Sequence, residues 1–399
     1  MAEKNDLALQ DFNTVLKARP ADGLALFRRG QIWQYSKADP GRARQDYDAS
    51  IAADPKRVLA WYFRGLLRQG AEDYDGALAD LDTALKLDPD ANNVARQRGA
   101  TLELMNRGPE ALRVYDSILK ARPDDAGTFT YRASLRRDTG DLKGALADAD
   151  KAIATDPDQM RAYRIRADVL DKQGHLDGAI AAAEAGLKHK PDDTTILGQV
   201  ADYYRRSGKF DLALARLDKA IKANPADAET VVARARVLLE KGDKVAADLA
   251  FDAAIAADPK STYAINERGR HRLDSAAYDK AIADFDAAAA IDSKFGAALF
   301  NRGLAYAGLR RFDRAIRDYN GYLSFFPGDA DALHFKGEAY RLLGDDLRAV
   351  EELDKAIAAK PDLALAWLRR GLARESLGDA EGARADKARA KRLDPHVED

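Results

Sequence analysis

The residues best suited to acid–base or metal chemistry in this chain are five histidines, and they are scattered. They are His175, His189, His271, His334 and His396. They form no HExxH motif and no other spacing typical of a metal site. The chain has no glycine-rich phosphate loop, nucleophile elbow or kinase signature, and its Cys count of 0 excludes thiolate catalysis, disulfides and cysteine-bound zinc. We therefore expect no catalytic, metal or cofactor site and no enzymatic activity.

Composition narrows the choice of partner and leaves the compartment open. The formal net charge is −2, which argues against nucleic acid as the main partner. Apolar stretches are far shorter than a membrane span, and no apolar run follows Met1–Asp6, so we expect neither a membrane helix nor a signal peptide. The Ala-, Asp- and Arg-rich composition is typical of bacterial proteins. Cytoplasm and periplasm both remain open.

Regularly spaced prolines indicate the structural elements that must position all other residues. Ten of the 13 prolines recur every 34 residues, with Ser293 in the one vacated place and Pro20 one residue off the grid. The ten are Pro55, Pro89, Pro123, Pro157, Pro191, Pro225, Pro259, Pro327, Pro361 and Pro395. A fixed period of this size indicates stacked structural repeats, in which each unit buries its apolar face on its neighbours.

One repeat, residues 58–89, shows how each unit is built. Trp61 and Gly65 lie at helical spacing in a first helix, and Ala77, Leu81 and Ala84 lie so in a second. The small residues predict a close approach of the two helices. The proline at the end of the unit cannot continue the second helix.

These residues resemble the tetratricopeptide repeat, whose pattern is Trp, Leu-Gly, Tyr, Ala, Phe, Ala and Pro. The Gly65 position is small in all eleven units: Gly30, Gly65, Gly99, Ala133, Ala167, Ala201, Ala235, Gly269, Gly303, Gly337 and Gly371. The resemblance covers residues 6–395. It implies an all-α fold, a right-handed α-solenoid or superhelix of helix-turn-helix units, with a concave face lined by the first helices.

The repeat register divides the chain into three parts. Residues 1–22 are expected to form a leading helix, the second helix of a truncated repeat; residues 23–395 form eleven tandem units and residues 396–399 a tail. The last unit carries Lys387 where others carry a large apolar residue, as a capping repeat does. The apolar stripe of residues 7–16 predicts either a longer natural chain or a homodimer through this helix.

A column of arginines precedes the small residues of the first helices. It comprises Arg29, Arg64, Arg98, Arg132, Arg166, Arg234, Arg268, Arg302 and Arg370, with Val200 and Lys336 as departures. An acid often stands on the second helix 16 residues later, or 17 in the first unit: Asp46, Asp80, Asp148, Asp284, Asp318, Glu352 and Asp386. One interpretation is a basic ladder for an anionic ligand. We favour the other, arginine stems packed along the core with their heads paired to these acids, because an unpaired charge beside a core is costly.

The resemblance also implies where a ligand would bind. Family members usually meet ligands through first-helix side chains one face away from the buried stripe. The candidates for a protein or peptide are Tyr62, Phe63, Arg161, Arg164, Arg205, Arg206, Tyr263, Asn266, Arg270, Phe300, Asn301, His334 and Phe335. Grouped aromatic residues flanked by Arg and Asn suit an extended peptide. For Phe300, His334 and Phe335 a packing role is an equally open interpretation.

The function expected from the sequence is that of a non-catalytic protein- or peptide-binding scaffold. The lysine–asparagine carboxylate clamp and the long asparagine ladder that some family members use are both missing. An alternative is a regulatory or substrate-recruiting repeat domain of a larger enzyme, such as a sugar transferase, with its catalytic part outside this chain. The identity of the partner stays open.

Overall fold

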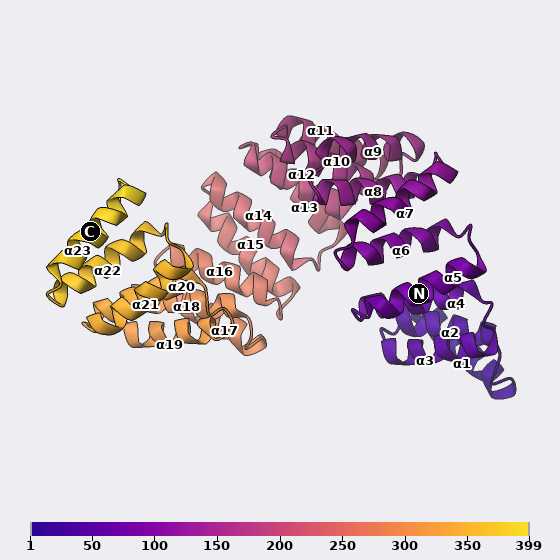
Figure 1. Cartoon of the computed structure of the whole chain (residues 1–399), viewed down its shortest axis with the longest axis horizontal. Helices are drawn as coiled ribbons and strands as arrows, with labels where there is room; N and C mark the ends of the chain where they lie inside the picture. Colours follow the sequence, from indigo (N-terminus) through magenta and orange to yellow (C-terminus); the bar gives the residue numbers. More distant parts are fainter. Residues whose placement is uncertain (1, 398–399) are drawn as a thin grey trace. The chain divides into compact units, whose positions relative to one another are not determined.

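The computed structural model describes residues 2–397, and this range contains 23 α-helices and no strand. α1 (Ala2–Ala18) is followed by hairpins of two helices each (Figure 1). The first helices are α2 (Gly23–Tyr35), α4 (Val58–Gly70), α6 (Asn92–Leu104), α8 (Ala126–Asp138), α10 (Met160–Lys172), α12 (Thr194–Arg206), α14 (Ala228–Lys241), α16 (Thr262–Asp274), α18 (Gly296–Gly308), α20 (Ala330–Leu342) and α22 (Ala364–Ser376). The second helices are α3 (Pro40–Ala53), α5 (Tyr74–Leu87), α7 (Gly108–Ala121), α9 (Leu142–Thr155), α11 (Leu176–His189), α13 (Phe210–Ala223), α15 (Lys244–Ala257), α17 (Tyr278–Ile291), α19 (Phe312–Leu323), α21 (Asp346–Ala359) and α23 (Ala380–Leu393). The predicted all-α class is confirmed, while residues 398 and 399 of the predicted tail lie outside the described range.

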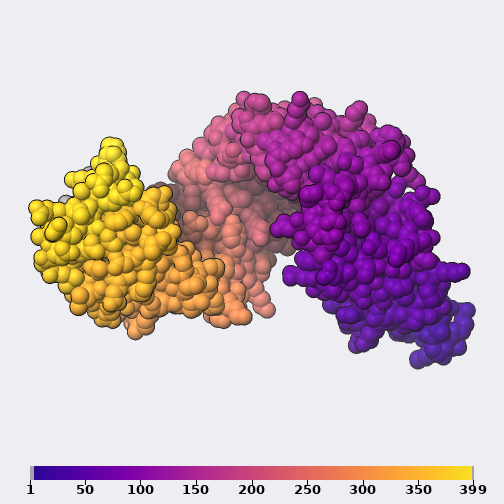
Figure 2. Space-filling view, in the orientation of Figure 1, coloured from indigo at the N-terminus to yellow at the C-terminus, as the bar shows by residue number. Residues whose placement is uncertain are grey.

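The chain divides into two compact units, residues 1–203 and 204–399, with the division inside α12. In the N-terminal unit every helix from α1 to α11 packs on the next, and in the C-terminal unit the same holds from α13 to α23. Neighbouring first helices also touch directly, as α4 touches α6 and α16 touches α18. Figure 2 shows the surface of the N-terminal unit, whose colours pass in sequence order from indigo to magenta without a break. Each unit is therefore a stack in which apolar faces are shared between neighbours.

Aspartates in the turns start many of the helices. The Asp73 carboxylate accepts a hydrogen bond from the Gly76 N–H at 3.0 Å, and Asp141 accepts one from Gly144 at 2.9 Å. Asp22, Asp39, Asp125, Asp227, Asp243, Asp329, Asp345 and Asp379 cap their helices in the same way. Each cap satisfies a backbone donor that the first helical turn leaves without a partner. Much of the Asp content is thus explained by turn geometry.

The two helices of a hairpin approach closely at the small residue of the first helix. A Cβ placed on Gly303 would lie 2.6 Å from the Tyr319 ring, and one on Gly269 would lie 2.6 Å from the Phe285 ring. Ala133 faces Ala149 across its hairpin, and both are fully buried. At Gly303 and Gly269 the absence of a side chain makes room for a ring of the second helix, because the two positions share one space.

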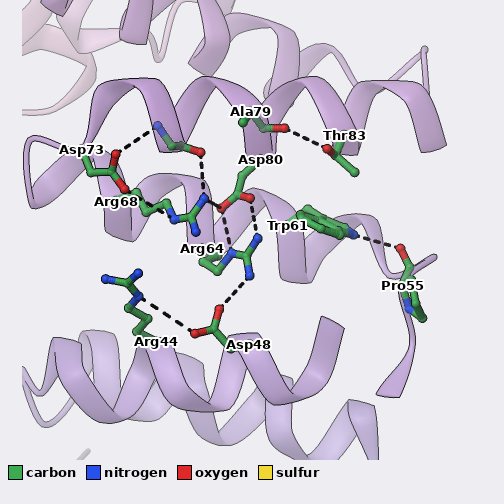
Figure 3. A network of polar contacts seen from close by, with 11 residues as sticks. Arg44, Asp48, Pro55, Trp61, Arg64, Arg68, Asp73, Ala79, Asp80 and Thr83 are labelled. Carbon is green, nitrogen blue, oxygen red and sulfur yellow. Dashed lines mark hydrogen bonds and ion pairs between the residues drawn. The ribbon is translucent and has the colours of Figure 1, made fainter. Parts of the chain in front are cut away.

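The arginine column is paired with acids, as predicted. Arg64 donates from Nε and Nη2 to the two oxygens of Asp80 at 2.8 and 2.6 Å (Figure 3). The same two-bond geometry joins Arg29 to Asp46, Arg132 to Asp148, Arg268 to Asp284, Arg302 to Asp318 and Arg370 to Asp386. Lys336 forms an ion pair with Glu352 at 3.1 Å. These bonds join the two helices of one hairpin with fixed geometry.

A second set of acids, which the sequence reasoning missed, extends the pairing to the preceding hairpin. Arg64 Nη1 also donates to Asp48 of α3 at 2.7 Å, and Arg302 Nη1 donates to Asp286 of α17 at 2.6 Å. Asp82, Asp116, Asp150, Asp218, Asp252 and Asp354 pair in the same way with the arginine 16 residues later. Arg64, Arg132, Arg268, Arg302 and Arg370 bind acids in both hairpins, so each of them joins two successive second helices through one guanidinium.

The close approach inside the hairpins predicts that Gly303→Ala destabilises the protein although alanine favours helix formation. The added methyl group would overlap the Tyr319 ring, so we expect a loss of about 1–3 kcal/mol in the free energy of unfolding. The control is Gly70→Ala, because a Cβ there meets nothing within 4 Å. That change should stabilise by about 0.5–1 kcal/mol. Urea denaturation followed by circular dichroism measures both, and equal effects of the two changes would contradict the packing argument.

The arginine pairing is tested by a double-mutant cycle on Arg302→Ala and Asp318→Ala. Their side chains are 20% and 10% exposed and share two hydrogen bonds, so a coupling energy of about 1–2 kcal/mol is expected. The control cycle uses Arg234 and Asp218, which share one bond and are 32% and 55% exposed. That cycle should give under about 1 kcal/mol. Full additivity at Arg302 and Asp318 would show that the pair has no role in stability.

Candidate protein-binding face

First helices present side chains that point away from their own second helices, and we call the surface these side chains form the first-helix face. Because neighbouring first helices touch, side chains from two successive hairpins meet there. In the C-terminal unit, several such meetings join residues 31 or 35 positions apart. They are Arg205 with Glu240, Arg236 with Glu267, Asn266 with Asn301, Phe300 with Phe335, and Glu338 with Arg369.

An open pocket of about 510 Å³ lies on this face between α16 and α18, and we call it the α16–α18 pocket. It brings together five residues predicted from the sequence: Tyr263, Asn266, Arg270, Phe300 and Asn301. α16 contributes side chains three, four and seven residues apart, and α18 does the same. One wall of each helix therefore faces the other across the pocket.

Two amides form part of the pocket lining. Asn301 donates from Nδ2 to Asn266 Oδ1 at 3.0 Å, and Asn266 is only 3% exposed. This bond uses one donor and one acceptor of the pair. The Asn266 amino group and the Asn301 amide oxygen retain hydrogen-bonding capacity. Together they offer one donor and one acceptor, which is the complement of a peptide unit.

A buried carboxylate, Glu267, also lines the pocket and was missed by the sequence reasoning. Arg236 donates to Glu267 Oε2 from Nε at 3.0 Å and from Nη2 at 2.5 Å, and Arg270 donates to Oε1 at 3.2 Å. The Arg270 side chain is still 51% exposed. Its spacing could have identified it, because Glu267 lies four residues after Tyr263 and three before Arg270 and so shares their side of the helix. The charge of Glu267 is balanced by the two arginines, so it gives the pocket no strong net potential.

Phe300 and Phe335 lie together beside this pocket in an aromatic cluster. Their ring centroids are 5.9 Å apart, and Phe300 also contacts Tyr322 at 5.2 Å and Tyr319 at 6.0 Å. Phe300 is half-buried, whereas Phe335 is 37% exposed. Packing and exposure are therefore both present, with Phe335 as the more accessible ring.

His334, which the sequence placed on the face, is 5% exposed and belongs to the interior. α22 packs directly on α20, and the ring lies 5.1 Å from that of Phe335. Its Nδ1 is buried without a hydrogen-bond partner among the described residues. Burial lowers the pKa of His334, with nearby Glu338 opposing this and Arg369 adding to it.

Among the predicted basic residues of the central repeats, the Arg161 and Arg205 side chains have local partners. In the N-terminal unit Arg161 lies over the Tyr131 ring at 4.8 Å and donates to Ser134 Oγ at 3.2 Å. The Arg164 carbonyl accepts a hydrogen bond from Gln199 at 3.2 Å. In the C-terminal unit Arg205 pairs with Glu240 at 2.7 Å, and Arg206 is exposed. These pairings argue against a ladder for an anionic polymer.

Tyr62 and Phe63 occupy the N-terminal end of the candidate set. Their rings are in edge contact at 5.2 Å, and Phe63 packs on Phe27 at 5.5 Å and Tyr35 at 6.1 Å. Burial raises the pKa of Tyr62. Phe63 thus belongs mainly to the core shared by α2, α3 and α4.

Within residues 2–397, no three His, Asp or Glu side chains gather in a way that could hold a metal ion. None of the helices in that range combines the length and apolar character needed to cross a bilayer.

Comparison with known proteins gives the family. The tetratricopeptide repeat pattern matches residues 64–126, 132–194, 201–262, 266–330 and 309–364. The chain belongs to the tetratricopeptide repeat family. Proteins of this family are generally protein-interaction scaffolds and are usually non-catalytic. No curated protein matches the chain with significant sequence similarity.

Solved structures with this repeat are also similar to the chain. A tetratricopeptide repeat protein from Parabacteroides merdae is 20% identical with a TM-score of 0.46, covering 59% of this chain and 93% of that one. Yeast Tom70 is 17% identical with a TM-score of 0.45, covering 94% and 85%. Pseudomonas aeruginosa pilF is 18% identical with a TM-score of 0.45, covering 51% and 93%.

The burial of His334 predicts a pH dependence of stability. The pKa of its folded form is below the ordinary value of about 6.5, so the unfolded chain binds the proton first as the pH falls. The free energy of unfolding should therefore decrease below about pH 6.5, and His334→Leu should reduce this decrease. Urea titrations between about pH 7.5 and 5.5 measure it. The matched control is His175→Leu at an exposed position. An equal change in pH slope for both variants would show that burial is not the cause.

Proposed function

We propose that this chain is a non-catalytic scaffold that binds an extended peptide segment of a protein partner on its first-helix face. The α16–α18 pocket is the anchor point of that segment. The observation that carries the proposal is the convergence of an amide pair, a paired Arg–Glu group and aromatic side chains on one pocket between two successive first helices. Convergent polar groups in a largely apolar hollow are typical of binding sites.

The amide pair supports a peptide as the ligand. One remaining donor and one remaining acceptor can hold the C=O and N–H of an extended backbone. The half-buried Phe300 and Tyr263 then cover an adjacent apolar side chain of the ligand. Tyr263 is steadied by Arg236, whose guanidinium lies 5.5 Å from the ring centroid.

The charge pairing supports a neutral or mixed segment over a strongly charged one. Glu267 already binds two arginines, and a ligand carboxylate or ammonium group would have to displace one of these partners. The exposed part of Arg270 can still accept one acidic group at the edge of the pocket. The preferred ligand is thus an extended peptide with an apolar residue flanked by at most one acid.

Peptides selected on the wild-type protein from a random displayed library provide the test. Isothermal titration calorimetry with a selected synthetic peptide should show about three- to tenfold weaker binding to Asn301→Ala, because one backbone hydrogen bond is lost. Asn320→Ala, an exposed amide on the second helix α19, is the matched control and should bind as wild type does. Circular dichroism checks that each variant is folded. Equal affinities for Asn301→Ala and wild type across the selected peptides would remove this pocket as the anchor.

A further inference from the structure

One position of the first helix carries a large side chain in every hairpin except one. It lies four residues before the small residue. The large residues are Leu26, Trp61, Phe129, Tyr163, Leu197, Val231, Ile265, Leu299, Leu333 and Trp367. In α6 the same position is Ala95.

The spacing to the small residue is four in all of these hairpins, so the positions are equivalent.

Where this large side chain is a tryptophan, it packs with the column arginine of the same hairpin. The Trp61 indole N–H donates to the Pro55 carbonyl at 2.9 Å, and the Arg64 guanidinium lies 4.8 Å from its ring centroid. Figure 3 shows this arrangement together with the bonds from Arg64 to Asp80. Trp367, Arg370, Pro361 and Asp386 repeat it at 2.9 and 4.7 Å. A guanidinium therefore sits between an aromatic ring and a carboxylate.

The hairpin of α6 and α7 lacks both of these partners. Ala95 replaces the ring, and Val114 stands where the other hairpin has Asp80. Arg98 keeps one hydrogen bond, from Nε to Asp82 at 2.6 Å. Neither Nη group of Arg98 has a hydrogen-bond partner within residues 2–397, and the side chain is 29% exposed.

An open hollow of about 650 Å³ occupies the place of the missing groups. α5 and α7 flank it, and Pro89, Ala95, Arg98, Arg113, Val114 and Ile118 are among the residues that line it. Pro89 corresponds to Pro55, whose carbonyl binds the Trp61 indole. The lining thus combines an apolar surface with the cations of Lys86, Arg98 and Arg113 and with the carboxylates of Asp82, Asp90 and Glu110. It lies in the N-terminal unit and is distinct from the α16–α18 pocket.

We propose that this hollow binds an aromatic carboxylate, meaning a ligand that carries a ring and a carboxylate close together. The ring takes the place that Trp61 and Trp367 fill in their hairpins. The carboxylate takes the place of the Asp80 carboxylate and binds the Nη groups of Arg98. A peptide that ends in tryptophan and free tryptophan share this chemistry, and an indole adds a donor for the Pro89 carbonyl.

The test is calorimetric titration of the full chain with N-acetyl-glycyl-tryptophan, its C-terminal amide, and free tryptophan. We expect the acid to bind wild type at least about tenfold more tightly than the amide does, because a charge-assisted hydrogen bond is lost in the amide. Affinity of the peptide above that of free tryptophan assigns the site to peptide C-termini. Equal affinity assigns it to the free amino acid.

Two variants place in the chain itself the ring and the carboxylate that the ligand would contribute. Ala95→Trp fills the hollow and should weaken binding of the acid at least tenfold, whereas the control Ala95→Ser keeps it open and should bind as wild type does. Val114→Asp gives Arg98 its missing carboxylate and should weaken the acid while leaving the amide unchanged. Should Ala95→Trp fail to fold, Val114→Asp alone decides the matter. Wild-type affinity of the acid for both variants, equal binding of acid and amide, or no binding at millimolar concentration would overturn the proposal.

Discussion

The whole structure depends on the close approach of two helices at one small residue in each hairpin. The first helix yields space at Gly30, Gly99, Gly269 and Gly303 so that Tyr47, Tyr115, Phe285 and Tyr319 can be buried across from them. A hairpin of this size cannot bury its own apolar surface, so each one is completed by the next. Spacing within one hairpin therefore sets the positions at which its neighbours, and any ligand, can make contact.

The arginine column fixes the same helix spacing through polar contacts. A guanidinium such as that of Arg302 reaches Asp318 in its own hairpin and Asp286 in the preceding one, so it holds two interfaces in register. The hydrogen bond to Asp318 raises the pKa of Arg302, and the group stays charged. Because these guanidinium groups are bound to carboxylates of the second helices, they do not form a free basic surface. The surface left for binding is the first-helix face, where pairing is local and exposed groups such as Phe335 and Arg270 remain.

Much of this arrangement could be predicted from the sequence because it repeats. The 34-residue period predicts the hairpins, and the pairing of Arg64 with Asp80 follows from their constant separation. The partner Asp48 was missed, since finding it requires knowing how one hairpin lies on the previous one. His334 was misplaced for a related reason: helical periodicity gives its direction on α20 but not the covering by α22. The meeting of Asn266 and Asn301 was foreseen as two residues of one face, while Glu267 between the two arginines was not.

Departures from the repeat carry the information that the repeat itself lacks. A position that is the same in every hairpin is explained by the stack, as the buried alanines and the column arginines are. Ala95 is a single exception in the sequence, whereas the acid that Val114 replaces is also missing after Arg166 and Arg234. Ala95 and Val114 become one feature only because both border the same guanidinium. Two losses on opposite sides of Arg98 leave its Nε bound to Asp82 and its two Nη groups with neither a ring nor a carboxylate, which is an unfavourable state beside an apolar surface. A ligand with a ring and a carboxylate would give Arg98 the contacts that Trp61 and Asp80 give Arg64. The departure from the repeat at Ala95 and Val114 is thereby explained as a binding site.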